Sequence, residues 1–308
     1  MNILNRQAFA AARRFLEASA RPLELARFQH AFMGVSSEVV LNALGRYQNA
    51  DGGIGHALEP DLRAPESSVL CTSIAFQIIR TLKTSPEHAL VSNGISFLAT
   101  NLDRGQGGWR IIPESAEYSP RAPWWYQKGR EEQFTGFSLN PTAEILGYLF
   151  DYPEQVGQGD IRAVSDCVLQ ELDSLAKIEM HELLCCLRLL QTTKLPPDYR
   201  DQLFARLKGL MKDKIACDPE QWEGYSLRPL QVVHSPESPF IAELEAAVAA
   251  NLDYELASQN ADGSWIPTWT WDDTFPEEWA KAKVEWSGAI TLEKLLMLKR
   301  FGRIEGVA

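Results

Sequence analysis

One phrase occurs twice in this chain and limits what the chain can fold into. Residues 48–53 read Gln-Asn-Ala-Asp-Gly-Gly and residues 259–264 read Gln-Asn-Ala-Asp-Gly-Ser, so five consecutive residues are identical. A weaker third copy occupies residues 101–109 and ends in Gly-Gly-Trp. Recurrence of one unit is typical of repeat architectures, in which each unit buries its apolar face only against its neighbours.

Apolar residues elsewhere recur at helical intervals, as in Phe9, Ala12, Phe15 and Leu16. Segment 68–79 is rich in β-branched residues, but it is longer than an ordinary strand, and residues 66–68 suit a helix start. Period-two alternation is nowhere sustained. The sequence therefore predicts an all-α fold, with further helices over 39–47, 88–100, 139–150, 161–176, 180–192, 198–213, 239–257 and 287–301.

The repeated phrase has the composition of a connection between helices. Its glycines can adopt positive φ at a helix end, and its Asp can accept hydrogen bonds from the first N–H groups of the next helix. Its Gln can reach across to a neighbouring hairpin, and the Trp of the later copies can stack over the turn. About five or six such hairpins fit the length. We expect one α/α-toroid domain over residues 1–308, with two rings of helices around a central cavity.

Composition excludes several classes of function. The chain of 308 residues has a net charge of −11, and its basic residues are scattered. Nucleic-acid binding needs clustered Lys and Arg, so the composition argues against it. The first residues do not resemble a signal peptide, and no run approaches the roughly 18 apolar residues of a membrane span. Five cysteines, an odd number, indicate reduced core thiols. We expect a cytoplasmic protein with no transmembrane segment.

Two aromatic segments, 103–137 and 259–286, have weak helical periodicity. Long loops are usually functional or disordered, and disordered segments are poor in Trp. We therefore expect both segments to be ordered and to shape one mouth of the toroid. Trp109 and Trp265 suit structural roles, whereas the candidates for lining a pocket are Trp124, Trp125, Trp269 and Trp271.

The units at 48–53 and 259–265 resemble the glutamine–tryptophan repeats of squalene–hopene cyclases and related terpenoid cyclases, and the corresponding repeats of protein prenyltransferase β subunits. That resemblance implies an α/α toroid whose outer helices are clasped by the repeat. The closer likeness is to uncharacterised bacterial proteins of this superfamily, in which the first phrase also continues into a segment like residues 55–61. Toroids host several chemistries, so the resemblance implies an activity less strongly than a fold.

The functional motifs of those families are incomplete in this chain. In class II terpenoid cyclases the middle carboxylate of an Asp-x-Asp-Asp motif is the acid, and the nearest segment here is Thr270-Trp271-Asp272-Asp273. The zinc-ligand pattern of prenyltransferases and the magnesium-binding pattern of ionising terpene synthases are both missing. We therefore predict no metal and no cofactor.

Asp272 and Asp273 are nonetheless the first catalytic candidates, because adjacent carboxylates in an apolar cavity can leave one protonated as a general acid. The alternative is that they cap a helix beginning near Pro276. Glu285, just before the predicted last helix, either faces the cavity or caps that helix.

Glu59 and Asp61 are the second pair of catalytic candidates. They flank Pro60 after a glycine-rich turn, and His56 and Arg63 are candidate binding residues beside them. The alternative is a surface loop in which Arg63 neutralises Asp61.

Three functions remain open from the sequence. The leading hypothesis is an enzyme that protonates an apolar, isoprenoid-like substrate in the central cavity. The second is a carbohydrate-active α/α barrel that uses paired carboxylates and Trp platforms, with the carboxylate separation reporting the stereochemical outcome. The third is a non-catalytic binding toroid. In each case the expected partner is a small molecule, and the oligomeric state is left open.

Overall fold

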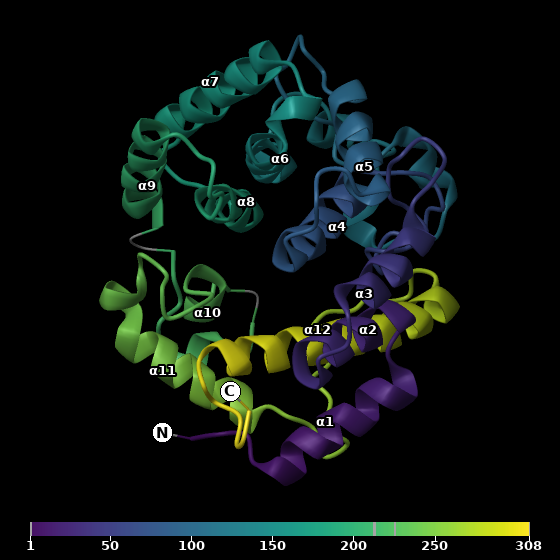
Figure 1. The fold of residues 1–308 in the computed structure, drawn as a ribbon, viewed down its shortest axis with the longest axis vertical. Helices are drawn as coiled ribbons and strands as arrows, with labels where there is room; N and C mark the ends of the chain where they lie inside the picture. The colour runs from purple at the N-terminus through teal and green to yellow at the C-terminus, as the bar shows by residue number, and fades with distance from the viewer. Residues whose placement is uncertain (1, 212–213, 225, 308) are drawn as a thin grey trace. The chain divides into compact units, whose positions relative to one another are not determined.

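The computed structural model describes residues 2–211, 214–224 and 226–307, and the regular elements that they form are helices (Figure 1). These residues form twelve α-helices and six short 3-10 helices, and their strand-like pairings are isolated bridges. The prediction of an all-α fold is confirmed. The helices belong to two compact units, residues 1–44 with 215–308, and residues 45–214.

The first unit combines both ends of the chain. Its helices are α1 (Arg6–Ser19), α2 (Pro22–Met33), α3 (Ser37–Leu44), η6 (Pro219–Gln221), α10 (Pro229–Val232), α11 (Ile241–Ala257) and α12 (Pro276–Arg300). The long helix α12 packs against α1 and α2, and α10 packs against α11. Leu4 pairs with Ile304 in a parallel bridge, so the two end segments of the chain lie side by side.

The second unit contains η1 (Gly45–Tyr47), α4 (Val69–Leu82), α5 (Ala89–Thr100), η2 (Glu114–Tyr118), η3 (Pro123–Trp125), η4 (Glu131–Phe134), α6 (Leu139–Asp151), η5 (Pro153–Gln155), α7 (Gln158–Ser174), α8 (Met180–Leu190) and α9 (Pro197–Met211). Successive helices pack as hairpins, α4 with α5, α6 with α7 and α8 with α9. The alternate helices α4, α6 and α8 also pack in a row (Figure 1). Helix α6 lies in the middle of that row, and almost all its residues are buried.

The repeated phrase fastens helices inside each unit. The Gln48 amide donates to the carbonyl oxygen of Gly52 at 2.9 Å and to that of Leu90, in α5, at 3.4 Å. The Gln259 amide makes the equivalent pair of bonds, to Gly263 at 3.0 Å and to Ala8, in α1, at 3.2 Å. The hairpin-clasping role that we expected for the glutamines is therefore confirmed.

Two other residues of the phrase act differently from our expectation. Asp51 and Asp262 accept hydrogen bonds within their own turns, from the N–H groups of Gly53 and Ser264, and do not cap the following helix. An aspartate side chain reaches the N–H two residues on more easily than a helix that begins later in the chain. The tryptophans of the later copies donate their indole N–H to helix carbonyls, Trp109 to Leu98 and Trp265 to Glu255.

Most predicted helices lie close to the observed ones, and residues 212–213 of the predicted helix 198–213 fall outside the described residues. Helices α2 and α10 were missed. The last helix begins at Pro276 and not at residue 287, so Glu285 lies inside α12 and caps nothing. The cause is composition, because charged residues and two tryptophans, Trp279 and Trp286, obscure the apolar stripe in the first three turns.

Among the described residues, no helix is both long enough and apolar enough to cross a membrane. All five cysteines carry free thiols. Cys71, Cys185 and Cys186 are buried, as expected for core residues, whereas Cys217 is exposed.

Candidate functional site

The strongest cluster of candidate residues lies in the second unit, where the loop after the first repeat pairs with the first aromatic segment. In the loop, His56 and Ala57 both have positive φ, at 54° and 58°. Non-glycine residues seldom adopt this conformation, and two in succession turn the chain sharply. The turn directs residues 58–62 into the unit, where all of them are buried.

Glu59 and Asp61 are both buried, with 7% and 3% of their surface exposed. The Glu59 carboxylate accepts a hydrogen bond from the backbone N–H of Asp61. The N–H of Leu62 donates to the Glu59 carbonyl at 3.0 Å and closes the turn. Pro60 fixes the intervening φ, so the two carboxylates are held in a rigid turn.

The partner of this turn is the segment around Arg121. Leu62 and Arg121 form an antiparallel bridge. The N–H of Ala122 donates to the Asp61 carbonyl at 2.9 Å, and the N–H of Arg63 donates to the Pro120 carbonyl at 3.0 Å. These bonds place the carboxylate turn beside the 3-10 helix that carries Trp124 and Trp125.

Arg121 organises the aromatic side of the site. Only 3% of its surface is exposed. Its Nη1 donates to the carbonyls of Glu117 and Ser119 at 2.7 and 2.8 Å, and its Nη2 lies 2.5 Å from the Glu117 carboxylate. The guanidinium also lies over the Tyr126 ring, 4.2 Å from the centroid. Its Nε is buried and has no acceptor among the described residues.

Further polar contacts join parts of the same segment to one another. The buried Gln127 receives a hydrogen bond from Arg110 at 2.5 Å and donates its amide to the Pro113 carbonyl at 2.9 Å. The backbone N–H of Gln127 donates to Glu117 at 2.9 Å. A loop with so many internal bonds can hold side chains in fixed positions without a helix or sheet of its own.

The two tryptophans of η3 differ in their surroundings. Trp124 is 39% exposed, which is unusual for the largest apolar side chain and leaves a ring surface open to a ligand. Trp125 is half-buried, and its indole N–H is fully enclosed without an acceptor among the described residues. Buried donors normally have partners, so this N–H marks a place where an acceptor is missing.

His56 and Arg63 lie at the edge of this cluster. His56 is exposed, and its Nε2 lies 2.8 Å from the Asn49 side-chain oxygen. It borders a shallow surface depression lined by residues 49–51, 56 and 65–67. Arg63 is half-buried, one residue beyond the bridge with Arg121.

The other acidic candidates are in the first unit. Asp272 and Asp273 are both exposed, in the turn before α12. An exposed carboxylate does not have the apolar surroundings that our general-acid hypothesis requires. The capping alternative also finds no support, because the N-cap residue of α12 is Phe275 and no side chain caps it.

Aromatic contacts account for Trp269 and Trp271. Trp271 is completely buried and packs against Trp279, with ring centroids 5.6 Å apart. Trp269 is half-buried and meets Trp286 edge to face at 5.1 Å. Glu285 lies 4.0 Å from Arg21, a residue that also pairs with Glu24 at 2.6 Å. Because Trp271 is fully buried against Trp279, it belongs to the core of the unit and does not line a pocket.

Sequence reasoning missed Arg121 and a second charged group in the second unit. Glu144, on α6, is buried and pairs with Arg188 of α8 at 2.9 Å, with the Cys185 thiol 3.6 Å away. Burial and the nearby carboxylate raise the pKa of Cys185 well above its usual value, so this thiol stays protonated and unreactive. In the sequence, the only sign of this buried pair is a glutamate within the otherwise apolar run 142–150.

No group of three or more His, Cys, Asp or Glu side chains in the described part of the chain is arranged to hold a metal ion. Comparison of the sequence with models of known protein families finds no match, and comparison with curated proteins finds none either. Inferences about function therefore rest on the geometry of the site.

Proposed function

We propose that the protein binds and transforms a carbohydrate-like small molecule at the site formed by residues 59–63 and 121–126. The observation that carries the proposal is the pairing of a buried carboxylate turn, Glu59 and Asp61, with a neighbouring segment that exposes Trp124. Sugars present hydroxyl groups to carboxylates and apolar C–H faces to aromatic rings. The Trp124 ring, which is 39% exposed, supplies the aromatic surface for such a face.

In this proposal Glu59 and Asp61 act as general acid and base, the usual roles of paired carboxylates in glycoside hydrolysis. Arg121 positions the aromatic side of the site, because its bonds to the 117–119 backbone and its contact with Tyr126 set the course of the segment. Trp124 is the platform. The five free thiols favour a reducing compartment, and we propose a cytoplasmic location.

The test is an activity and binding screen with cello-, malto-, chito- and galacturono-oligosaccharides. We expect Glu59→Gln and Asp61→Asn to abolish turnover, whereas Glu66→Gln, an exposed carboxylate in the same loop, leaves it unchanged. Removal of the Trp124 ring should weaken binding about tenfold. Turnover that survives both carboxylate substitutions would reject the assignment, and binding without turnover would support a non-catalytic site.

The resemblance of the repeats supports a second proposal, an isoprenoid-converting enzyme of the terpenoid cyclase superfamily. The observation in its favour is that Gln48 and Gln259 clasp helices, the role that the resemblance implies for them. Purified protein assayed with prenyl diphosphates and squalene-like polyenes tests it, with Asp272→Asn as the variant. Conversion that this substitution leaves unchanged removes Asp272 from the mechanism.

A further inference from the structure

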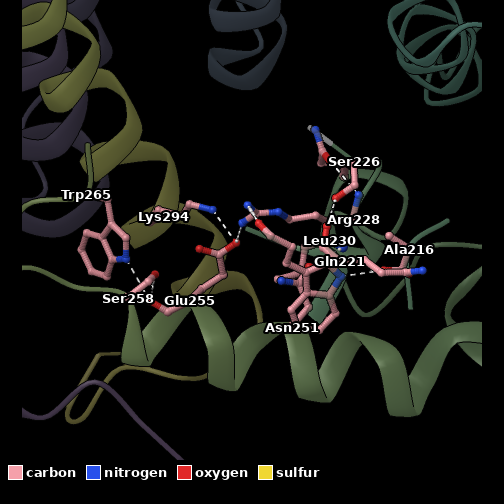
Figure 2. A network of polar contacts seen from close by, with 12 residues as sticks. Ala216, Gln221, Ser226, Arg228, Leu230, Asn251, Glu255, Ser258, Trp265 and Lys294 are labelled. Carbon is pink, nitrogen blue, oxygen red and sulfur yellow. Dashed lines mark hydrogen bonds and ion pairs between the residues drawn. The ribbon is translucent and has the colours of Figure 1, made fainter. Parts of the chain in front are cut away.

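A second polar cluster lies in the first unit, where three segments bring charged side chains together (Figure 2). Glu255 comes from α11, Lys294 from α12, and Arg228 from the residue just before α10. Lys294 Nζ lies 2.6 Å from Glu255 Oε1, and Arg228 Nη1 lies 3.2 Å from the same oxygen. Figure 2 shows both cationic groups directed at this one carboxylate.

Among the described residues, the cluster has more positive than negative charge. Two cations share the single carboxylate of Glu255, which is only 3% exposed. The neighbouring carboxylate on α11, Asp253, is paired with Arg303 at 2.7 Å. The Tyr254 ring, 5.3 Å from the Arg228 guanidinium, contributes no formal charge. Charges that are largely removed from solvent are normally balanced, so an excess cation beside a buried carboxylate favours binding of a further anion.

Both cations link other segments of the unit to Glu255 of α11, Arg228 from the residue before α10 and Lys294 from α12. Arg228 already joins Glu255 to the Trp222 carbonyl, to which its Nη2 donates, and so fastens the α10 segment to α11. Lys294 adds a second positive charge beside Arg228. Burial and the Arg228 charge lower the pKa of Lys294 despite the contact with Glu255, so the protonated lysine is held at a cost.

An unused donor lies one helical turn away. The Asn251 side chain is completely buried, and its oxygen accepts the N–H of Leu230 at 3.2 Å. Its Nδ2 has no acceptor among the described residues. Residues four apart share a helix face, so Asn251 lies on the same face of α11 as Glu255. Ammonium, guanidinium and amide groups are all donors, and the ligand chemistry that suits such a set is an oxyanion.

Solvent can reach the two cations. The side chain of Lys294 is 25% exposed and that of Arg228 is 17% exposed, whereas Glu255 is enclosed behind them. A ligand arriving from solvent therefore meets the two positive groups first. We propose that Arg228, Lys294 and Asn251 form a binding site for the carboxylate or phosphate group of an organic small molecule.

Isothermal titration of the full chain with inorganic phosphate and, separately, with succinate tests the proposal, in buffers matched for ionic strength with chloride. We expect saturable binding of at least one of the two, and the one that binds identifies the oxyanion group. Lys294→Met should weaken that binding at least tenfold. Lys281→Met removes an exposed lysine from the same helix and should change nothing.

A third variant keeps the test decisive if Lys294→Met does not fold. Asn251→Asp retains the oxygen that accepts the Leu230 N–H and supplies the missing negative charge internally, so it should also abolish binding of the probe. Absence of binding to the wild-type protein overturns the proposal. Binding that survives both Lys294→Met and Asn251→Asp overturns it equally, because the probe then binds elsewhere.

Discussion

Gly263 provides the sharpest test of the clasp that joins α11 to α1. It has a φ of 92°, and a Cβ placed on it would lie 2.2 Å from the Ala11 carbonyl carbon and 2.4 Å from the Ala12 nitrogen. Both are backbone atoms of α1, so no side-chain rotation relieves the clash. The left-handed backbone costs an alanine roughly 1–2 kcal/mol, and overpacking typically adds roughly 1–3 kcal/mol.

We therefore expect Gly263→Ala to lower the free energy of unfolding by roughly 2–5 kcal/mol. The matched control is Gly209→Ala in α9, where a Cβ meets nothing within 4 Å. That substitution should stabilise the protein by about 0.5–1 kcal/mol, because alanine favours a helix interior over glycine. Urea denaturation followed by circular dichroism and tryptophan fluorescence measures both. A Gly263→Ala protein as stable as the wild type would refute the steric reasoning.

Two further pairs of variants test buried polar groups by thermal and urea unfolding. Glu255→Gln should destabilise the protein by about 3–5 kcal/mol because it leaves two cations without their counter-charge. Glu278→Gln, which breaks an exposed pair with Lys281, should change stability by less than about 1 kcal/mol; equal effects would show that burial is not the cause. Thr142→Val should stabilise the protein by about 1 kcal/mol, since the buried Thr142 hydroxyl has no partner among the described residues. Thr72→Val should instead destabilise it by about 1–3 kcal/mol, because that hydroxyl bonds both Ile54 and Ser68; a loss in both threonine variants would contradict the reasoning.

Much of the helical fold follows from local sequence. The N-cap of α4 at Ser68, with its side chain bonded to the Cys71 N–H at 3.0 Å, is a signal that a reader of the sequence can find. The start of α12 was harder, since its first turns expose charged residues and place tryptophans where a periodic apolar stripe would stand. Periodicity is informative only when one face of a helix is buried and the opposite face is solvated.

The candidate site was only partly predictable. Glu59 and Asp61 were recognisable because a proline and glycine-rich turn surrounded them. Arg121 was not recognisable, because its role depends on contacts with backbone carbonyl groups and with the Tyr126 ring. No sequence pattern predicts these contacts. Asp272 and Asp273 had the composition of a catalytic pair, but the turn before α12 leaves both of them in solvent.

The sequence by itself determined the helices and the repeated turn, because helix caps, glycines at positive φ and apolar spacing act over a few residues. It also determined the role of the two glutamines, since both lie at the same offset from a turn that only glycine can make. Tertiary structure alone decided which polar side chains meet. The packing of α10, α11 and α12 brings two cations to Glu255 and encloses the Asn251 amide without an acceptor among the described residues. The charge balance and burial of a side chain depend on residues distant in sequence, so they cannot be predicted from the local sequence and are set only when the chain has folded.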